Sequence, residues 1–220
     1  MMAISSTKNT WDDFLTGWPY SLFGTVYFQF QIIRYMQREY PPPIKILEVG
    51  CGRGQLSVLL SDLGYNVTAS DIDEQLLKQL QSQCSVRPNL TTKKASLFEL
   101  PYRDSAFDVV ISQGVMDHFD EENVIKGIKE QLRVGRSVIV DVPNKRSKQN
   151  FGDERLFSNR KWKYLIQEAG GTLRDFLGRD RVSSAVEFLR PSSGRLPFVS
   201  FYWWKHVSKT SMFVISQKEC

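Results

Sequence analysis

The chain has 220 residues, of which 41% are hydrophobic and 24% are charged. This length suits one domain with a substantial buried core, and the composition excludes a disordered or fibrous chain. No apolar stretch reaches the roughly 18 residues that a membrane helix needs. The first residues also lack the basic start and apolar core of a secretory signal, so we expect a cytoplasmic protein without a membrane span.

Cysteine and histidine are sparse. The three cysteines, Cys51, Cys84 and Cys220, are odd in number and widely scattered. Without a C-x-x-C pair they support neither a disulfide framework nor a zinc site. His118 and His206 are also far apart in sequence, and we expect no metal ion.

The net charge of +5 is unevenly distributed along the chain. Residues 1–132 hold 12 Lys/Arg and 16 Asp/Glu, whereas residues 133–220 hold 17 and 8. A basic region of this kind can attract an anionic substrate, a nucleic acid or an acidic protein. A solvated basic face is an equally good interpretation.

The first expected element is an aromatic-rich helical segment over residues 11–40, which includes Trp18, Tyr20 and Tyr27. Prolines at 41–43 end it, because proline cannot continue a helix and restrains the residue before it. We interpret residues 1–43 as an N-terminal helical cap. Simple packing against the rest of the fold would explain the same side chains.

The most informative stretch is ILEVGCGRG, from Ile46 to Gly54. An apolar strand leads into three glycines at alternate positions, and glycine permits a tight turn with exposed backbone. A dinucleotide fingerprint requires G-x-G-x-x-G, but its third glycine position is occupied by Gln55. The acid Glu48 would repel a diphosphate and suits an ammonium or sulfonium group. An ordinary glycine-rich turn is the alternative.

These residues resemble the first motif of the class I methyltransferases that use S-adenosylmethionine. In that family the glycine loop passes under the methionine part of the cofactor. The resemblance implies that Glu48, Gly50, Cys51, Gly52 and Gly54 contact the cofactor.

After this motif, strands and helices alternate. Leucines at helical spacing predict a helix over residues 55–63, with Gly64 as its C-cap, and a second helix around Leu76, Leu77 and Leu80. Strands are expected at 66–70, 90–94, 107–112 and 137–142, and a further helix around Val124, Ile128 and Leu132. The nearly continuous apolar character of FDVVIS is typical of a buried parallel strand.

The C-terminal part predicts a helix capped by Ser158 and two last strands. These strands, 172–177 and 211–216, correspond to an antiparallel edge pair in the family resembled. Between them, residues 178–210 form an insertion with clustered aromatic side chains, which suit a core better than a substrate wall. The segment 145–155 is polar and is expected to be a loop.

Strands alternating with helices predict a doubly wound α/β fold. The resemblance implies a Rossmann-like seven-stranded sheet, with residues 44–220 as one S-adenosylmethionine-binding domain behind the cap. Ligands of such sheets lie at the carboxyl ends of the strands.

The loops at those ends carry further candidate residues. Asp71 ends the second strand, where a carboxylate can accept hydrogen bonds from both ribose hydroxyls. Ile72 follows it beside the adenosine. Ser96 and Leu97 lie in the segment that holds the adenine ring in the family, and Ser96 departs from the acid that many relatives have there. Gln113 would lie near the amino group of the cofactor.

The segment QGVMDHF, residues 113–119, supplies the candidate catalytic residues Asp117 and His118. A neutral imidazole can serve as a general base near physiological pH, although His118 would equally well orient the loop. Additions before the first strand commonly help to form the acceptor pocket in the family, so Tyr20 and Tyr27 are further candidates.

The sequence therefore predicts an S-adenosylmethionine-dependent methyltransferase acting on an O, N or C centre of a small molecule, similar to quinone-pathway enzymes. The alternatives are a cyclase or lyase that expels methylthioadenosine, an RNA or protein methyltransferase, and a non-catalytic subunit with a relict pocket. Nucleic acid is disfavoured because the loop after the fourth strand lacks an N/D-P-P-Y/F sequence. The sequence leaves the oligomeric state undetermined.

Overall fold

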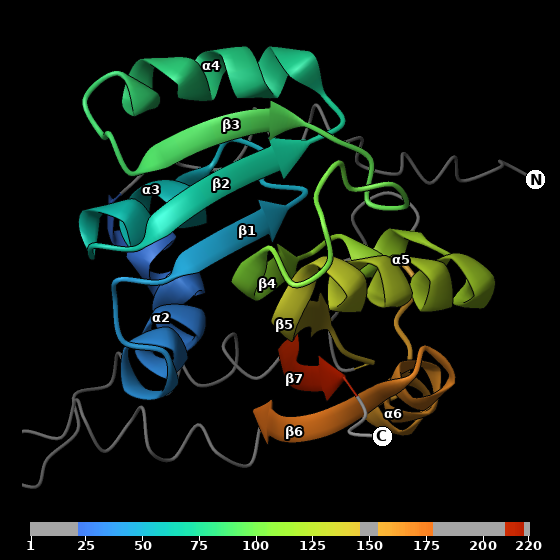
Figure 1. Cartoon of the computed structure of the whole chain (residues 1–220). Helices are drawn as coiled ribbons and strands as arrows, with labels where there is room; N and C mark the ends of the chain where they lie inside the picture. Colours follow the sequence, from blue (N-terminus) through green and yellow to red (C-terminus); the bar gives the residue numbers. More distant parts are fainter. Residues whose placement is uncertain (1–21, 146–153, 178–209, 218–220) are drawn as a thin grey trace, which may run out of the picture.

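A computed structural model describes residues 22–145, 154–177 and 210–217. These residues form a seven-stranded sheet with helices on both faces (Figure 1). The predicted doubly wound α/β fold is confirmed. The division into a cap over residues 1–43 and a domain over residues 44–220 stays a prediction.

Five parallel strands make up most of the sheet. They are β1 (Lys45–Val49), β2 (Asn66–Asp71), β3 (Leu90–Lys94), β4 (Phe107–Gln113) and β5 (Gly135–Pro143). An antiparallel pair, β6 (Gly171–Leu177) and β7 (Thr210–Gln217), completes the sheet in the order β3-β2-β1-β4-β5-β7-β6. The order reverses between β1 and β4, and in open α/β sheets such a switch point is where ligands bind.

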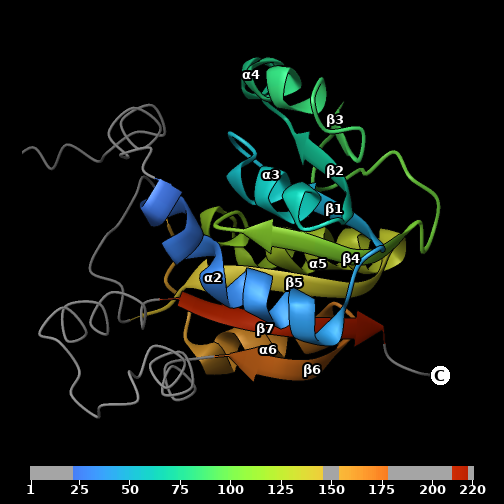
Figure 2. The ribbon, with the colours of Figure 1, turned by 90° about the vertical axis from the view of Figure 1, so that its left-hand side faces the viewer.

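Three helices cover one face of the sheet: α2 (Leu22–Glu39), α3 (Gln55–Asp62) and α4 (Glu74–Cys84). Figure 2 shows α2 lying along the sheet, with its first residues at the end where the β4 arrowhead points. The expected helical segment before the first strand is thus present over residues 22–39. Residues 1–21, which hold Tyr20, lie outside the described residues.

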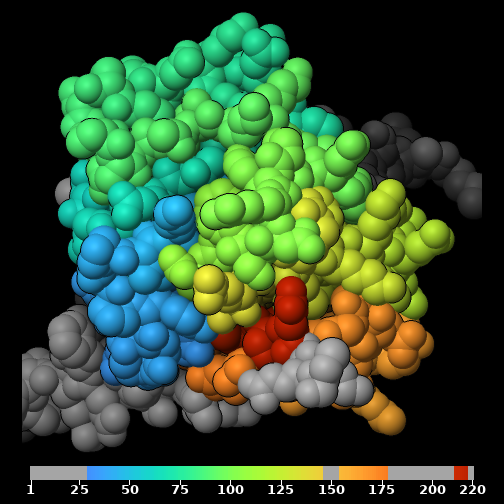
Figure 3. Space-filling view, in the orientation of Figure 1, coloured from blue at the N-terminus to red at the C-terminus, as the bar shows by residue number. Residues whose placement is uncertain are grey.

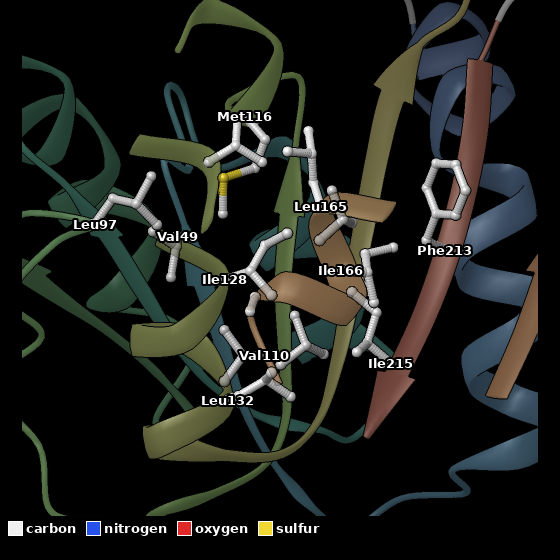
Figure 4. Close-up of a cluster of buried hydrophobic side chains, with 14 of the residues drawn as sticks. Val49, Leu97, Val110, Met116, Ile128, Leu132, Leu165, Ile166, Phe213 and Ile215 are labelled. Atoms are coloured by element: carbon white, nitrogen blue, oxygen red, sulfur yellow. The ribbon is translucent and has the colours of Figure 1, made fainter. Parts of the chain in front are cut away.

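Two helices, α5 (Glu121–Val134) and α6 (Asn159–Glu168), cover the opposite face. Ile128 and Leu132 of α5 and Leu165 and Ile166 of α6 are buried against the strands, together with Phe213 of β7 (Figure 4). Ser158 caps α6 by accepting a hydrogen bond from Lys161 N, as predicted. Burial of these apolar side chains on both faces holds the carboxyl ends of β1, β2 and β4 in a fixed relation.

Candidate cofactor-binding site

The bend after β1 depends on three glycines in the left-handed region. Gly50, Gly52 and Gly54 have φ values of 69°, 53° and 72°. A Cβ on Gly50 would lie 2.5 Å from Val115, and one on Gly54 would lie 2.4 Å from Leu80. A Cβ on Gly52 would meet no described atom within 4 Å. Gly50 and Gly54 therefore permit close packing, while the space beside Gly52 is open to a ligand.

Asp71 connects the end of β2 to this bend. Its Oδ2 accepts a hydrogen bond from Gly52 N at 2.8 Å, and its Oδ1 accepts one from Asp73 N at 2.9 Å. The next side chain, Ile72, is 70% exposed. A large exposed apolar side chain beside a half-buried carboxylate suits a ligand with a polar sugar and an apolar ring.

Glu48 lies at the other side of the bend and is only 4% exposed. Its carboxylate accepts a hydrogen bond from the Ser57 hydroxyl, in the first turn of α3. Burial raises the pKa of Glu48 to about 7, against the hydrogen bonds from Ser57, which lower it. Burial also raises the pKa of the Cys51 thiol, so this cysteine stays protonated at neutral pH.

The segment after β3 is held in place by Arg133 of α5. The guanidinium donates to the backbone oxygens of Leu100 and Tyr102 at 2.9 and 2.8 Å, and it pairs with Glu130 and Asp104. Figure 3 shows green atoms of the segments that follow β3 and β4 on one face, next to the blue atoms of α2. Arg133 thus fixes the chain that carries Ser96 and Leu97.

Ser96 and Leu97 have different surroundings. Ser96 is partly buried, and its hydroxyl accepts a hydrogen bond from Phe98 N at 3.3 Å. Leu97 is buried in the core below α5. The Ala95 amide donates to the Asp71 carbonyl at 3.0 Å, which ties this segment to the end of β2.

Gln113 is the last residue of β4 and is partly buried. Its Nε2 donates to Asp141 Oδ2 of β5 at 3.0 Å. The next residue, Gly114, has a φ of 62°, and a Cβ there would meet no described atom within 4 Å. Gln113 and Gly114 therefore lie beside the β1 bend, which contacts the same loop through Gly50 and Val115.

A single turn of 3-10 helix, η1 (Met116–His118), follows within the expected loop. Met116 and Asp117 are buried, and His118 is largely buried. His118 Nε2 lies 3.6 Å from Asp117 Oδ2. The Asp117 carbonyl also accepts a hydrogen bond from Arg155 N at 2.6 Å, so Arg155 lies against this turn.

Comparison with known proteins gives a family match that includes the residues of this site. A family model described as a methyltransferase domain matches residues 46–137. The match contains the glycine bend, the carboxylate at 71 and the turn at 116–118. Residues 46–137 are therefore similar to a methyltransferase domain. The predicted superfamily is thereby confirmed.

Two curated relatives are similar to this chain over about a hundred residues. The eEF1A lysine and N-terminal methyltransferase of Bos taurus is 34% identical over 101 residues, which are 43% of this chain and 14% of the relative. A probable S-adenosylmethionine-dependent methyltransferase of Mycolicibacterium smegmatis is 30% identical over 101 residues, 46% of this chain and 38% of the relative. The chain thus spans well under half the length of these relatives.

Solved structures extend the likeness in fold beyond the methyltransferase domain. Magnesium protoporphyrin IX methyltransferase from Synechocystis PCC 6803, with bound SAH, has a TM-score of 0.65 at 15% identity and covers 89% of this chain and 84% of its own. The family match and this ligand support S-adenosylmethionine as the cofactor. Relatives named as methyltransferases support the prediction of a transferase.

The residues present fit that cofactor. The open space beside Gly52, the Asp71 carboxylate and the exposed Ile72 side chain would hold the adenosyl part, and Gln113 would lie near the amino-acid part. These roles stay predictions. No group of three His, Cys, Asp or Glu side chains suitable for a metal ion occurs among the described residues. No helix in the described ranges is both long and apolar enough to cross a membrane.

The structure does not describe the side chains of two residues predicted to form the acceptor pocket. Tyr20 precedes the described residues, and Tyr27 belongs to α2 without a described side chain. The sequence reasoning did not single out Ser57 or Asp141, which contact Glu48 and Gln113. Asp141 offered a signal, because a charged residue interrupts the otherwise apolar strand sequence SVIVDV. Ser57 offered none, since serine is common in the first turn of a helix.

Proposed function

We propose that the chain is an S-adenosylmethionine-dependent methyltransferase that acts on an O, N or C centre of a small molecule. The observation that carries the proposal is the open space beside Gly52, bordered by the Asp71 carboxylate and adjoining the loop after β4. A cationic adenosyl ligand suits this setting because carboxylates lie close to it and no phosphate-binding glycine follows at position 55.

When bound, S-adenosylmethionine supplies an electrophilic methyl group. The residues of the chain orient it. Asp71 would accept hydrogen bonds from the ribose hydroxyls, the Ser96 hydroxyl and the Leu97 backbone N–H would face the adenine ring, and Gln113 would face the amino group. Methyl transfer is an in-line displacement, so holding donor and acceptor in near-attack geometry supplies much of the rate.

A base is needed only when the acceptor atom must lose a proton, as a hydroxyl, an ammonium or a C–H group does. In that case His118 is the base, because its imidazole lies in the turn after β4 and contacts Asp117 at 3.6 Å. The neighbouring carboxylate would orient the ring. The largely buried position of His118 favours an acceptor group that reaches into the molecule.

Protein methylation is a second candidate, because the Bos taurus relative is named as a lysine and N-terminal methyltransferase. An extended lysine side chain can also reach a recessed base. The basic C-terminal part of the chain would then attract an acidic protein.

One experiment separates these activities. The full chain is incubated with S-adenosylmethionine labelled in its methyl group, first alone and then with either a protein-free metabolite extract or an acidic protein fraction. The proposal expects S-adenosylhomocysteine with label in the small-molecule extract. Label in protein supports the second candidate, and methylthioadenosine formed without an acceptor supports a lyase. If no labelled product appears and calorimetry shows no binding of S-adenosylmethionine, the proposal is wrong.

A further inference from the structure

One carboxylate near the carboxyl ends of the strands touches the candidate site only through Gln113 and Gly114 in the contacts described so far. Asp141 of β5 is only 7% exposed, although it lies in a strand whose neighbouring residues are apolar. Its partner in the parallel register is Gln113, the last residue of β4. A buried carboxylate is costly unless it is hydrogen-bonded, so its position beside Gln113 needs a reason.

Asp141 holds the loop after β4 through two of its oxygens. The Oδ2 atom accepts from Gln113 Nε2 at 3.0 Å, and the carbonyl oxygen accepts from Gly114 N at 2.8 Å. The side chain and the backbone of the residue thus fix two consecutive residues at the end of β4.

The contact also decides which way the Gln113 amide faces. An ionised carboxylate only accepts hydrogen bonds, so the amide must present its NH₂ group to Asp141. The amide is planar, and its oxygen therefore faces away from Asp141. Among the described residues, no donor forms a hydrogen bond with Gln113 Oε1.

The loop that Asp141 fixes adjoins the glycine bend. Glu48 of β1 lies level with Ile111 of β4, so two residues further along each parallel strand Gly50 approaches the level of Gln113. A Cβ on Gly50 would touch Val115, two residues after Gln113. An acceptor oxygen at this place suits a donor such as the ammonium group of the cofactor.

We propose that Asp141 is a positioning residue, which orients the Gln113 amide so that Oε1 accepts a hydrogen bond from the ammonium group of the bound cofactor. The inference rests on the proposed use of S-adenosylmethionine. Without Asp141, the Gln113 amide could turn by 180° and present its two N–H donors to the cation, which is unfavourable. Asp141 thus favours ligands with a free amine over those that lack the amino-acid part.

The test compares two ligands on the full chain by calorimetry: S-adenosylhomocysteine, which carries the ammonium, and methylthioadenosine, which lacks the amino-acid part. Asp141→Asn allows the neighbouring amide to face either way. We expect this variant to bind S-adenosylhomocysteine about fivefold to tenfold more weakly, with methylthioadenosine binding unchanged. Asp108→Asn is the matched control, because Asp108 accepts from Lys45 N at the opposite end of β4; it should change neither affinity.

A rescue variant distinguishes orientation from a structural role. In Gln113→Glu combined with Asp141→Asn, the new amide donates to the new carboxylate, which keeps an oxygen directed at the ammonium. We expect affinity for S-adenosylhomocysteine within twofold of wild type. Equal weakening of both ligands in Asp141→Asn, or no recovery in the double variant, would overturn the inference. A wild-type chain that binds neither S-adenosylmethionine nor S-adenosylhomocysteine would instead refute the proposed function.

Discussion

The bend after β1 and the loop after β4 lie side by side but are built in different ways. The first takes its shape from glycine backbone, with Asp71 of β2 accepting a hydrogen bond from Gly52 N. The second is held by Asp141 of β5 and by the backbone of Arg155, both far along the chain. The bend can thus be recognised from its glycine spacing, whereas the loop after β4 takes its shape from segments far along the chain.

The largest expected effect tests how the β1 bend packs against α4. Gly54→Ala would place a Cβ at positive φ and 2.4 Å from the buried Leu80 side chain. We expect the free energy of unfolding to fall by about 4 kcal/mol, from backbone strain together with overpacking. Chemical denaturation would measure this change.

The control for that variant is Gly170→Ala, at a φ of 79° with no described atom within 4 Å of its Cβ. Only the left-handed conformation should cost free energy there, about 1–2 kcal/mol. Equal losses for the two variants would show that contact with Leu80 does not define the bend.

The second prediction concerns Glu48 and pH. The pKa of Glu48 is raised from 4.5 to about 7, so the folded chain keeps a proton that the unfolded chain releases. Stability from this group is present below pH 4.5 and is lost as the pH rises to about 7. Glu48→Gln removes the titration, and its free energy of unfolding relative to wild type should increase by on the order of 3 kcal/mol between pH 5 and pH 8.

Thermal and urea unfolding at several pH values would measure that difference. Glu122→Gln is the control, because Glu122 is exposed in the first turn of α5. A Glu48→Gln curve parallel to the wild-type curve would show that the buried carboxylate does not titrate in this range.

The third prediction tests the loop after β4. If His118 removes a proton from the acceptor, His118→Gln should lower kcat about 100-fold, because general-base catalysis typically contributes 10²–10⁴. Binding of S-adenosylhomocysteine should remain unchanged, since the predicted adenosyl contacts are in the β1 bend and at the end of β2. An unchanged kcat would leave His118 the role of orienting the loop through its contact with Asp117.

The smallest expected effect is on binding. Gly52→Ala projects a methyl group into the open space beside the Asp71 contact. Affinity for S-adenosylhomocysteine should fall about tenfold, which corresponds to about 1.4 kcal/mol. Stability should fall no more than in Gly170→Ala, because both glycines have positive φ and open surroundings. Unchanged affinity would place the ligand elsewhere.

The contrast between the two regions also explains which features were predictable from the sequence. Strand and helix positions followed from apolar periodicity, and the glycine spacing located the β1 bend. The antiparallel β6 and β7 pair was expected from the family resemblance, and the structure confirms it. The pairing of Gln113 with Asp141 was not foreseen, because it joins residues that are distant in sequence.

Arg133 has a consequence for the thermodynamics of ligand association. Its guanidinium, at the end of α5, holds the backbone of Leu100 and Tyr102. This segment is therefore ordered when the chain folds, and a nucleoside that binds against it does not have to order it. The entropic cost of ligand binding should therefore be modest. A substitution that removes the Arg133 hydrogen bonds should raise this cost, although Arg133 itself would not contact the ligand.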